Sequence, residues 1–170
     1  MGTVIRRLLL LRHGKADTPL GVTDRDRPLA GRGHRQAEYA GAQVRAQGTM
    51  PDLAVVSPAL RTRETWEAFA AALPTPPKLD IDQRLYANTV DDLLEVITGV
   101  PEDVGTLLVV GHNPSIGGLA STLDDDPPPS LHRALDDGYP TGTLAEFTLN
   151  VPWPDVAPGA GQLRAVIRRP

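Results

Sequence analysis

Arginine and histidine side chains stand directly after apolar runs in this 170-residue chain. Arg12 and His13 follow one such run, His112 follows another, and Arg61 comes shortly after a third. Arginine binds phosphate through two parallel hydrogen bonds, and imidazole is a nucleophile or a hydrogen-bond donor near neutral pH. A pocket that collects these side chains suits a dianion, and phosphate is the obvious candidate.

Apolar runs rich in branched residues predict the strands that carry these side chains. Residues 4–11, 53–56 and 106–110 are predicted to be buried strands, and the last of them is the clearest. Three further segments are predicted strands, at residues 79–82, 142–151 and 163–168.

The helical spacing of apolar residues predicts four helices between the strands. The first begins at Gly33 and ends near Gly48. The other three follow from the apolar faces Trp66, Phe69, Ala70 and Leu73; Val90, Leu93, Leu94 and Ile97; and Ile116, Leu119, Ala120 and Leu123.

Two dipeptides, Ser57-Pro58 and Asn113-Pro114, predict helix starts directly after strands. Each offers a capping side chain followed by proline, which is favoured at the first helical position. We assign Ser57 to capping rather than to nucleophilic catalysis, because no Gly-x-Ser-x-Gly elbow surrounds it.

Strands that alternate with helices predict an α/β fold, a three-layer α/β/α sandwich around a mixed, mostly parallel central sheet. Ligands bind beyond the carboxyl ends of the strands in such sheets, and helix N-termini attract anions. Because the arginines and histidines above follow strands, we expect them to line one cleft.

Residues 15–31 and 124–140 are predicted loops, and the second, which is acidic and rich in proline, is predicted to be mobile.

The length of 170 residues predicts one domain, residues 1–170, without a large cap inserted over the cleft. A chain of this size buries roughly two-thirds of the surface that its unfolded form exposes, so its core needs no disulfide or metal. The absence of cysteine excludes disulfides, iron–sulfur clusters, cysteine-ligated zinc and thiol catalysis.

The net charge of −4 excludes the global basic field that gathers nucleic acid, so we expect no nucleic-acid partner. Only four leucines separate Arg7 from Arg12, fewer than the core of a secretion signal needs. No run approaches the roughly 20 apolar residues of a membrane span. We therefore expect a soluble, cytoplasmic protein that binds no membrane, with its oligomeric state left open.

Three segments resemble, in order and spacing, the histidine phosphatase superfamily of phosphoglycerate mutase-like proteins: LLLLRHGKA, SPALRTRETW and VVGHNP. The defining feature of that superfamily is an Arg-His-Gly signature after the first strand. The segments RPLAGRGHRQA and TGTLAEF make the phosphohistidine phosphatases of SixA type the most similar branch. The resemblance runs from about residue 5 to 150.

This resemblance implies a phosphatase in which His13 attacks phosphorus and becomes phosphorylated before water releases phosphate. Arg12, Arg61 and a protonated His112 would bind the equatorial oxygens of the phosphoryl group. Asn113 is a further candidate for phosphate binding. No cofactor and no metal are implied, and the partner is a phosphorylated substrate, foremost a phosphohistidine protein.

Lys15 stands where relatives often carry an acidic residue after Arg-His-Gly. It either adds to the positive rim of the phosphate pocket or lies only on the loop.

The sequence departs from many superfamily members where they carry an acid that protonates the leaving oxygen. Here the stretch reads DQRLYANTVDD, and the nearest carboxylates, Asp82 and Asp91, do not match the motif position. An alkoxide leaves poorly without such an acid, whereas phosphohistidine leaves as neutral imidazole once its far nitrogen is protonated. We therefore predict a preference for phosphoramidates over alkyl phosphates.

Two alternatives stay open. One is a broad small-molecule phosphomonoesterase, against which the short chain and the missing acid argue. The other is a non-catalytic module that binds phosphate or a phosphoprotein. The role of the acidic loop 124–140 is also open, and we interpret its residues 124–126 as a solvated charge cluster rather than a cation site.

Overall fold

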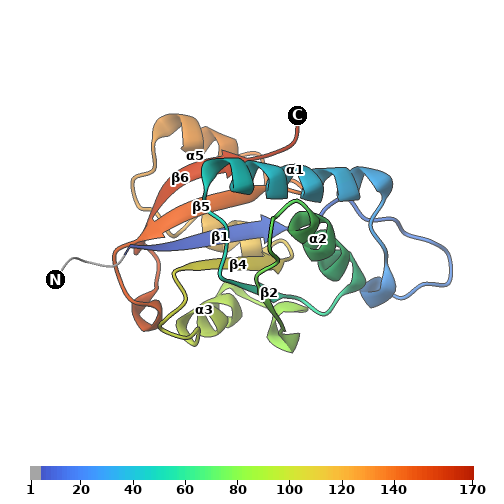
Figure 1. Cartoon of the computed structure of the whole chain (residues 1–170), viewed down its shortest axis with the longest axis horizontal. Coiled ribbons are helices and arrows are strands. Elements are labelled where there is room, and N and C mark those ends of the chain that lie inside the picture. Colours follow the sequence, from blue (N-terminus) through green and yellow to red (C-terminus); the bar gives the residue numbers. More distant parts are fainter. Residues whose placement is uncertain (1–4) are drawn as a thin grey trace.

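A six-stranded sheet lies at the centre of the computed structural model, which describes residues 5–170 (Figure 1). The strand order is β3-β2-β4-β1-β5-β6. The first four of these are mutually parallel, while β5 runs antiparallel to β1 and β6 antiparallel to β5. The bounds are β1 Arg6–Arg12, β2 Leu53–Val56, β3 Lys78–Ile81, β4 Thr106–Gly111, β5 Leu144–Leu149 and β6 Gly161–Ile167. The prediction of a mixed, mostly parallel α/β sheet is confirmed, although Val4 lies outside the described residues.

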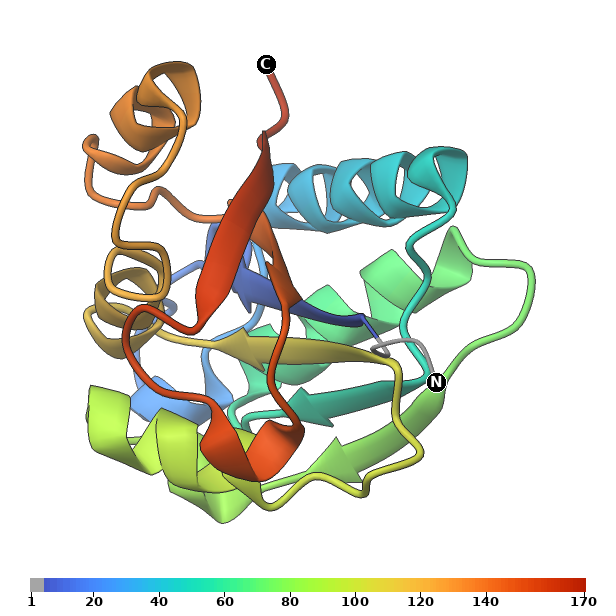
Figure 2. The ribbon, with the colours of Figure 1, turned by 90° about the vertical axis from the view of Figure 1, so that its left-hand side faces the viewer.

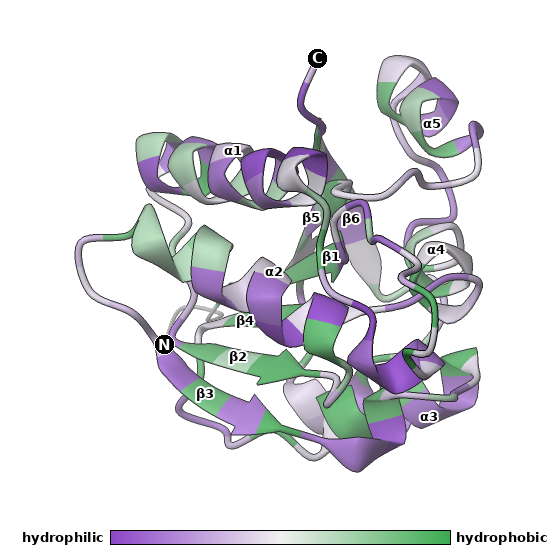
Figure 3. Cartoon of the chain, turned by 90° about the vertical axis from the view of Figure 1, so that its right-hand side faces the viewer, coloured by the Kyte–Doolittle hydropathy of each residue, from purple (hydrophilic) through white to green (hydrophobic). Residues whose placement is uncertain are grey.

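The central strands carry continuous apolar runs because helices cover both faces of the sheet. Along β1, Leu8 and Leu10 belong to the core on one face, and Leu9 and Leu11 belong to the core on the other. All four leucines are fully buried. Figure 3 shows the resulting contrast between the hydrophobic β2 and the edge strand β3, where hydrophilic and hydrophobic residues alternate.

Two helices cover one face and three contribute to the core on the other. Helices α1, Gly31–Gln47, and α2, Leu60–Ala71, pack on the first face. The opposite core includes residues of α3, Val90–Thr98, α4, Ser115–Ala120, and α5, Pro129–Leu135. Figure 2 shows α1 and α3 on opposite sides of the sheet. Within residues 5–170, no helix has both the length and the apolar composition that a membrane span needs.

The predicted loop 124–140 is wrong in part, because it contains α5. Leu131 and Leu135 lie one helical turn apart, and both pack against the core beneath α5. Arg168, after β6, donates to the carbonyl of Ala134 and pairs with Asp137. Leu131 and Leu135 lie among prolines and acidic residues in the sequence, and for that reason their helical spacing was not recognised.

The predicted helix starts are also corrected. Helix α2 begins at Leu60 with Ala59 at its N-cap, so Ser57 is not the capping residue. The hydroxyl of Ser57 accepts from the N–H of Ala59 at 3.3 Å and also lies 2.7 Å from the Nε2 atom of His112. Helix α4 begins at Ser115, one residue after the proline, although the Oδ1 atom of Asn113 does accept from the N–H of Gly117 in its first turn at 3.0 Å.

Helix α1 begins at Gly31, two residues before the predicted start, and ends at Gln47 with Gly48 as its C-cap, near the predicted end. Gly48 adopts a left-handed conformation with φ of 72°, which favours glycine at this position.

Tyr139 links the edge of the parallel strands to the antiparallel pair. Its hydroxyl donates to the carbonyl of Leu10 in β1 at 2.6 Å and accepts from the N–H of Ala145 in β5 at 3.0 Å. Leu10 and Ala145 face each other in the strand register, and Tyr139 is 2% exposed. The hydroxyl therefore satisfies two buried backbone groups at once.

We expect Tyr139→Phe to lower the free energy of unfolding by about 1–3 kcal/mol, because it leaves a buried carbonyl and a buried N–H unpaired. Urea denaturation at neutral pH measures this change. Tyr39→Phe on α1 is the matched control, with an expected change within about 0.5 kcal/mol. Equal losses in the two variants would show that the Tyr139 bridge contributes nothing specific.

Candidate active site

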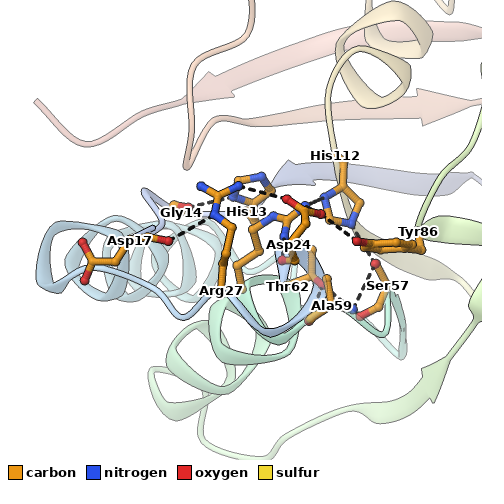
Figure 4. Close-up of polar contacts among 11 residues, drawn as sticks. His13, Gly14, Asp17, Asp24, Arg27, Ser57, Ala59, Thr62, Tyr86 and His112 are labelled. Carbon is orange, nitrogen blue, oxygen red and sulfur yellow. Dashed lines mark hydrogen bonds and ion pairs between the residues drawn. The ribbon is translucent and has the colours of Figure 1, made fainter. Parts of the chain in front are cut away.

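The carboxyl ends of the parallel strands bring together the histidines that the sequence singles out. β1 and β4 pair in register from Arg7 with Thr106 to Arg12 with Gly111, so the next residues, His13 and His112, leave the sheet side by side. Their ring centroids are 5.4 Å apart. Each histidine is 8% exposed, so the two rings form the floor of the site (Figure 4).

His13 is held as a neutral imidazole with a defined tautomer. Its Nδ1 atom lies 2.7 Å from the carbonyl oxygen of Gly14, which can only accept, so Nδ1 carries the proton. Burial, reinforced by the charges of Arg61 and Arg12, lowers the pKa of His13 to about 4. At neutral pH the lone pair therefore resides on Nε2, where it can act as a nucleophile.

His112 is also neutral and has the opposite tautomer. Its Nδ1 atom accepts from a guanidinium nitrogen of Arg61 at 3.3 Å, because guanidinium groups only donate. The proton is then on Nε2, which donates to the hydroxyl of Ser57 at 2.7 Å. Burial and the nearby Arg61 lower the pKa of His112 to about 3. The protonated His112 expected from the sequence would require a bound anion that raises this pKa.

Two guanidinium groups add positive charge beside the imidazoles. Arg61 lies in the first turn of α2 and is 7% exposed. Arg12 ends β1 and donates to the carbonyl of Tyr139 at 3.2 Å. Burial and the charge of Arg61 lower the pKa of Arg12. Within residues 5–170, the Nε–H groups of both arginines are buried without a hydrogen-bond partner, so the site has unmatched donors, as expected for an anion pocket.

Two hydrogen bonds of the Thr65 hydroxyl hold the backbone after His13 next to α2. The N–H of Gly14 donates to the Thr65 hydroxyl at 3.0 Å, and the same hydroxyl donates to the carbonyl of Arg61 at 2.6 Å. A Cβ atom on Gly14 would lie 2.5 Å from the carbonyl oxygen of Gly33. The glycine of Arg-His-Gly is therefore required by the close approach of the His13 loop to α1.

Sequence reasoning missed Asp24, which lies in a short 3-10 helix of the loop between β1 and α1. Its carboxylate accepts from Arg61 at 3.2 Å, from Arg27 at 3.1 Å and from the Tyr86 hydroxyl at 2.6 Å. The Tyr86 bond, with Arg27 and Arg61, lowers the pKa of Asp24 to about 2. No periodicity marks these loop residues, although Arg27 opens the segment RPLAGRGHRQA on which part of the family resemblance rests.

The weaker site predictions have different outcomes. The side-chain amide of Asn113 donates to the carbonyls of Gly138 and Tyr139, so a phosphate contact would require these bonds to break. Lys15 is exposed, its backbone is held by Gln36 and Ala30, and its predicted phosphate contact stays a prediction.

The two carboxylates considered as acids do not line the cleft beside His112. This cleft of about 390 Å³ is lined by Tyr86, Ala87, Asn88, Thr89, His112, Asn113, Pro114 and Ser115. Asp82 is paired with Arg84 at 2.7 Å, which lowers the pKa of its carboxyl. Asp91 is exposed in the first turn of α3. Across residues 5–170, no three His, Asp or Glu side chains cluster in a way that could hold a metal ion.

Comparison with known proteins agrees with this geometry. A family model described as the histidine phosphatase superfamily (branch 1) matches residues 8–86. A solved structure of a candidate phosphohistidine phosphatase SixA from Nakamurella multipartitia is 31% identical, covers 96% of both chains and superimposes with a TM-score of 0.82. An uncharacterized protein of Mycobacterium tuberculosis is 34% identical over 90% of this chain and 96% of its own length. The phosphohistidine phosphatase SixA of Escherichia coli is 25% identical over 85% of this chain and 86% of its own.

The depressed pKa values of His13 and His112 predict a loss of stability in mild acid. An unfolded imidazole titrates near pH 6.5, so below that pH the unfolded chain binds protons that the folded chain refuses. The contribution is complete above about pH 6.5 and is lost as the pH falls toward the folded values of about 4 and about 3. Each histidine contributes at most about 1.4 kcal/mol per pH unit.

Urea unfolding at pH 7 and pH 5 tests this expectation. His112→Asn should lose less stability between the two pH values than the native chain, while the control His34→Asn, at a half-buried position on α1, should lose as much as the native chain. Equal losses for all three proteins would contradict the neutral state of His112.

Proposed function

The chain belongs to the histidine phosphatase superfamily, and from this premise we propose that it is a phosphatase that removes phosphate from phosphohistidine. The observation that carries the proposal is the neutral His13, whose Nδ1–H is bound to Gly14 and whose Nε2 lone pair lies beside two arginines. The Escherichia coli relative, a phosphohistidine phosphatase by name, supports the substrate class.

The proposed reaction has two steps. In the first, Nε2 of His13 attacks phosphorus while the bond from phosphorus to the leaving nitrogen breaks, and that nitrogen keeps the electron pair. Arg12 and Arg61 stabilise the negative charge on the equatorial oxygens. In the second step, water attacks the phosphorylated His13 and releases inorganic phosphate, which restores the neutral imidazole.

The state of the carboxylates favours a phosphoramidate over an alkyl phosphate. Asp24 has a pKa of about 2, and Arg84 likewise lowers the pKa of Asp82, so neither holds a proton for an alkoxide at neutral pH. Imidazole needs no such donor at the leaving nitrogen when its other nitrogen already carries a proton.

The open cleft beside His112 suits a side chain presented by another protein. The proposed partner is therefore a phosphohistidine protein. The single domain over residues 1–170 and the cytoplasmic location belong to the same proposal and stay predictions.

A labelled phosphoryl donor tests the covalent intermediate. We expect rapid quenching of the protein with radiolabelled phosphoramidate to trap a label that is stable in base and labile in acid. His13→Ala should lose both the label and turnover, whereas His34→Ala should keep both. Turnover without any label on His13 would contradict the mechanism, and phosphate binding without turnover would identify a binding module.

Substrate preference is tested separately. We expect kcat/KM for a phosphohistidine peptide to exceed that for a sugar phosphate by at least about 100-fold, because a missing general acid typically costs that much for a basic leaving group. Steady-state release of inorganic phosphate measures both values. Equal efficiency on the two substrates would instead identify a broad phosphomonoesterase.

A further inference from the structure

The Asp24 carboxylate contacts arginine side chains and is also partly exposed to solvent. Its side chain is 56% exposed, while the Arg61 side chain that it contacts is 8% exposed. The backbone carbonyl of Asp24 also accepts from Arg61 at 2.7 Å. Figure 4 shows Asp24 beside His112 and Tyr86. Since both histidines are nearly buried, Asp24 belongs to the outer rim of the site.

The rim carboxylate is fixed as an ionised acceptor. Tyr86 and Arg61 donate to one oxygen, and Arg27 donates to the other. Arg25 lies over the Tyr86 ring at 5.6 Å and adds a further positive charge behind this contact. Tyr86, Arg27 and Arg61 act on the Asp24 carboxylate, and its negative charge acts in turn on the neutral His112. A carboxylate with three donors is held in place and does not supply a proton.

An ionised carboxylate at the rim can stabilise a leaving group that is positively charged. His13 attacks from the floor of the site, so an in-line displacement expels the leaving nitrogen toward the rim. A phosphohistidine that leaves as neutral imidazole has a proton on its far nitrogen and therefore a positive charge before the bond breaks. An ionised carboxylate stabilises that charged N–H, whereas it repels the negative oxygen of a departing alkoxide.

We propose that Asp24 binds the protonated leaving group of N–P substrates and sets the preference of this site for phosphoramidates over phosphoesters. Asp24 accepts a hydrogen bond from the cationic leaving group through an oxygen lone pair that faces solvent in this structure. In phosphohistidine the leaving nitrogen takes the electron pair of the P–N bond, and the proton on the far nitrogen stays where it is. In phosphoramidate the protonated leaving nitrogen takes the same electron pair and departs as ammonia. This assignment rests on the proposed function and adds the residue that recognises its substrate class.

The same carboxylate opposes the binding of a dianion, because it is negatively charged and accepts from one guanidinium nitrogen of Arg61. Its removal should therefore change two measurements in opposite directions. Inhibition by inorganic vanadate should strengthen, while hydrolysis of N–P substrates should weaken. A residue that only held Arg61 in place would weaken both.

The test compares Asp24→Asn with the native chain on phosphoramidate, a phosphohistidine peptide and p-nitrophenyl phosphate, whose leaving group needs no proton. We expect the ratio of kcat/KM for each N–P substrate to kcat/KM for p-nitrophenyl phosphate to fall by roughly 10- to 100-fold, the size of a lost charged hydrogen bond. Asp17→Asn makes the same charge change at an exposed position of the same loop and should leave the ratio unchanged. Activity on p-nitrophenyl phosphate also reports that each variant is folded.

The outcomes separate this assignment from the function on which it rests. An unchanged ratio in Asp24→Asn, with the native chain active on the phosphohistidine peptide, overturns the role of Asp24 and leaves the proposed function standing. A native chain that hydrolyses p-nitrophenyl phosphate but no N–P substrate overturns both. A reduced ratio together with tighter vanadate inhibition supports the role of Asp24.

Discussion

Two arginines and two histidines cluster at the carboxyl ends of the parallel strands, which is possible because the histidines stay neutral. A protonated imidazole beside Arg61 would add a like charge where little water remains to screen it, and the pKa values of His13 and His112 fall accordingly. Each ring then has one donor and one acceptor, and its neighbours fix which nitrogen is which. The nucleophile, its tautomer and the distribution of positive charge are thus consequences of one electrostatic constraint.

The fold meets this constraint through contacts between backbones as much as through side chains. The parallel pairing of β1 with β4 places the two imidazoles at one level of the sheet. The close approach of Gly14 to Gly33 presses the His13 loop against α1, and Tyr139 joins β1 to β5 below it. The central strands of this scaffold belong to the buried apolar core, so the position of the reacting atoms is set by a close-packed part of the molecule.

The sequence predicts this scaffold well because buried parallel strands have an unmistakable composition. Residues 53–56 are a strand with the predicted bounds, and the residues that follow the strands converge as expected. Loop residues are different, since the contact of Asp24 with Tyr86 depends on two loops meeting in space, which no local pattern records. The role of Ser57 was predicted incompletely for a similar reason, because its hydroxyl accepts from the nearby N–H of Ala59 and also has a long-range partner in His112.

The Thr65 hydroxyl joins the N–H of Gly14 to the carbonyl of Arg61, so the nucleophile is positioned from the same helix that supplies a phosphate-binding cation. The short 3-10 helix Asp24–Asp26, which carries the rim carboxylate, takes no part in that link. Evolution can therefore rebuild the rim of this site by loop substitutions while the reaction geometry stays intact. Such a separation allows the range of substrates to diverge during evolution while the phosphoryl-transfer reaction is kept.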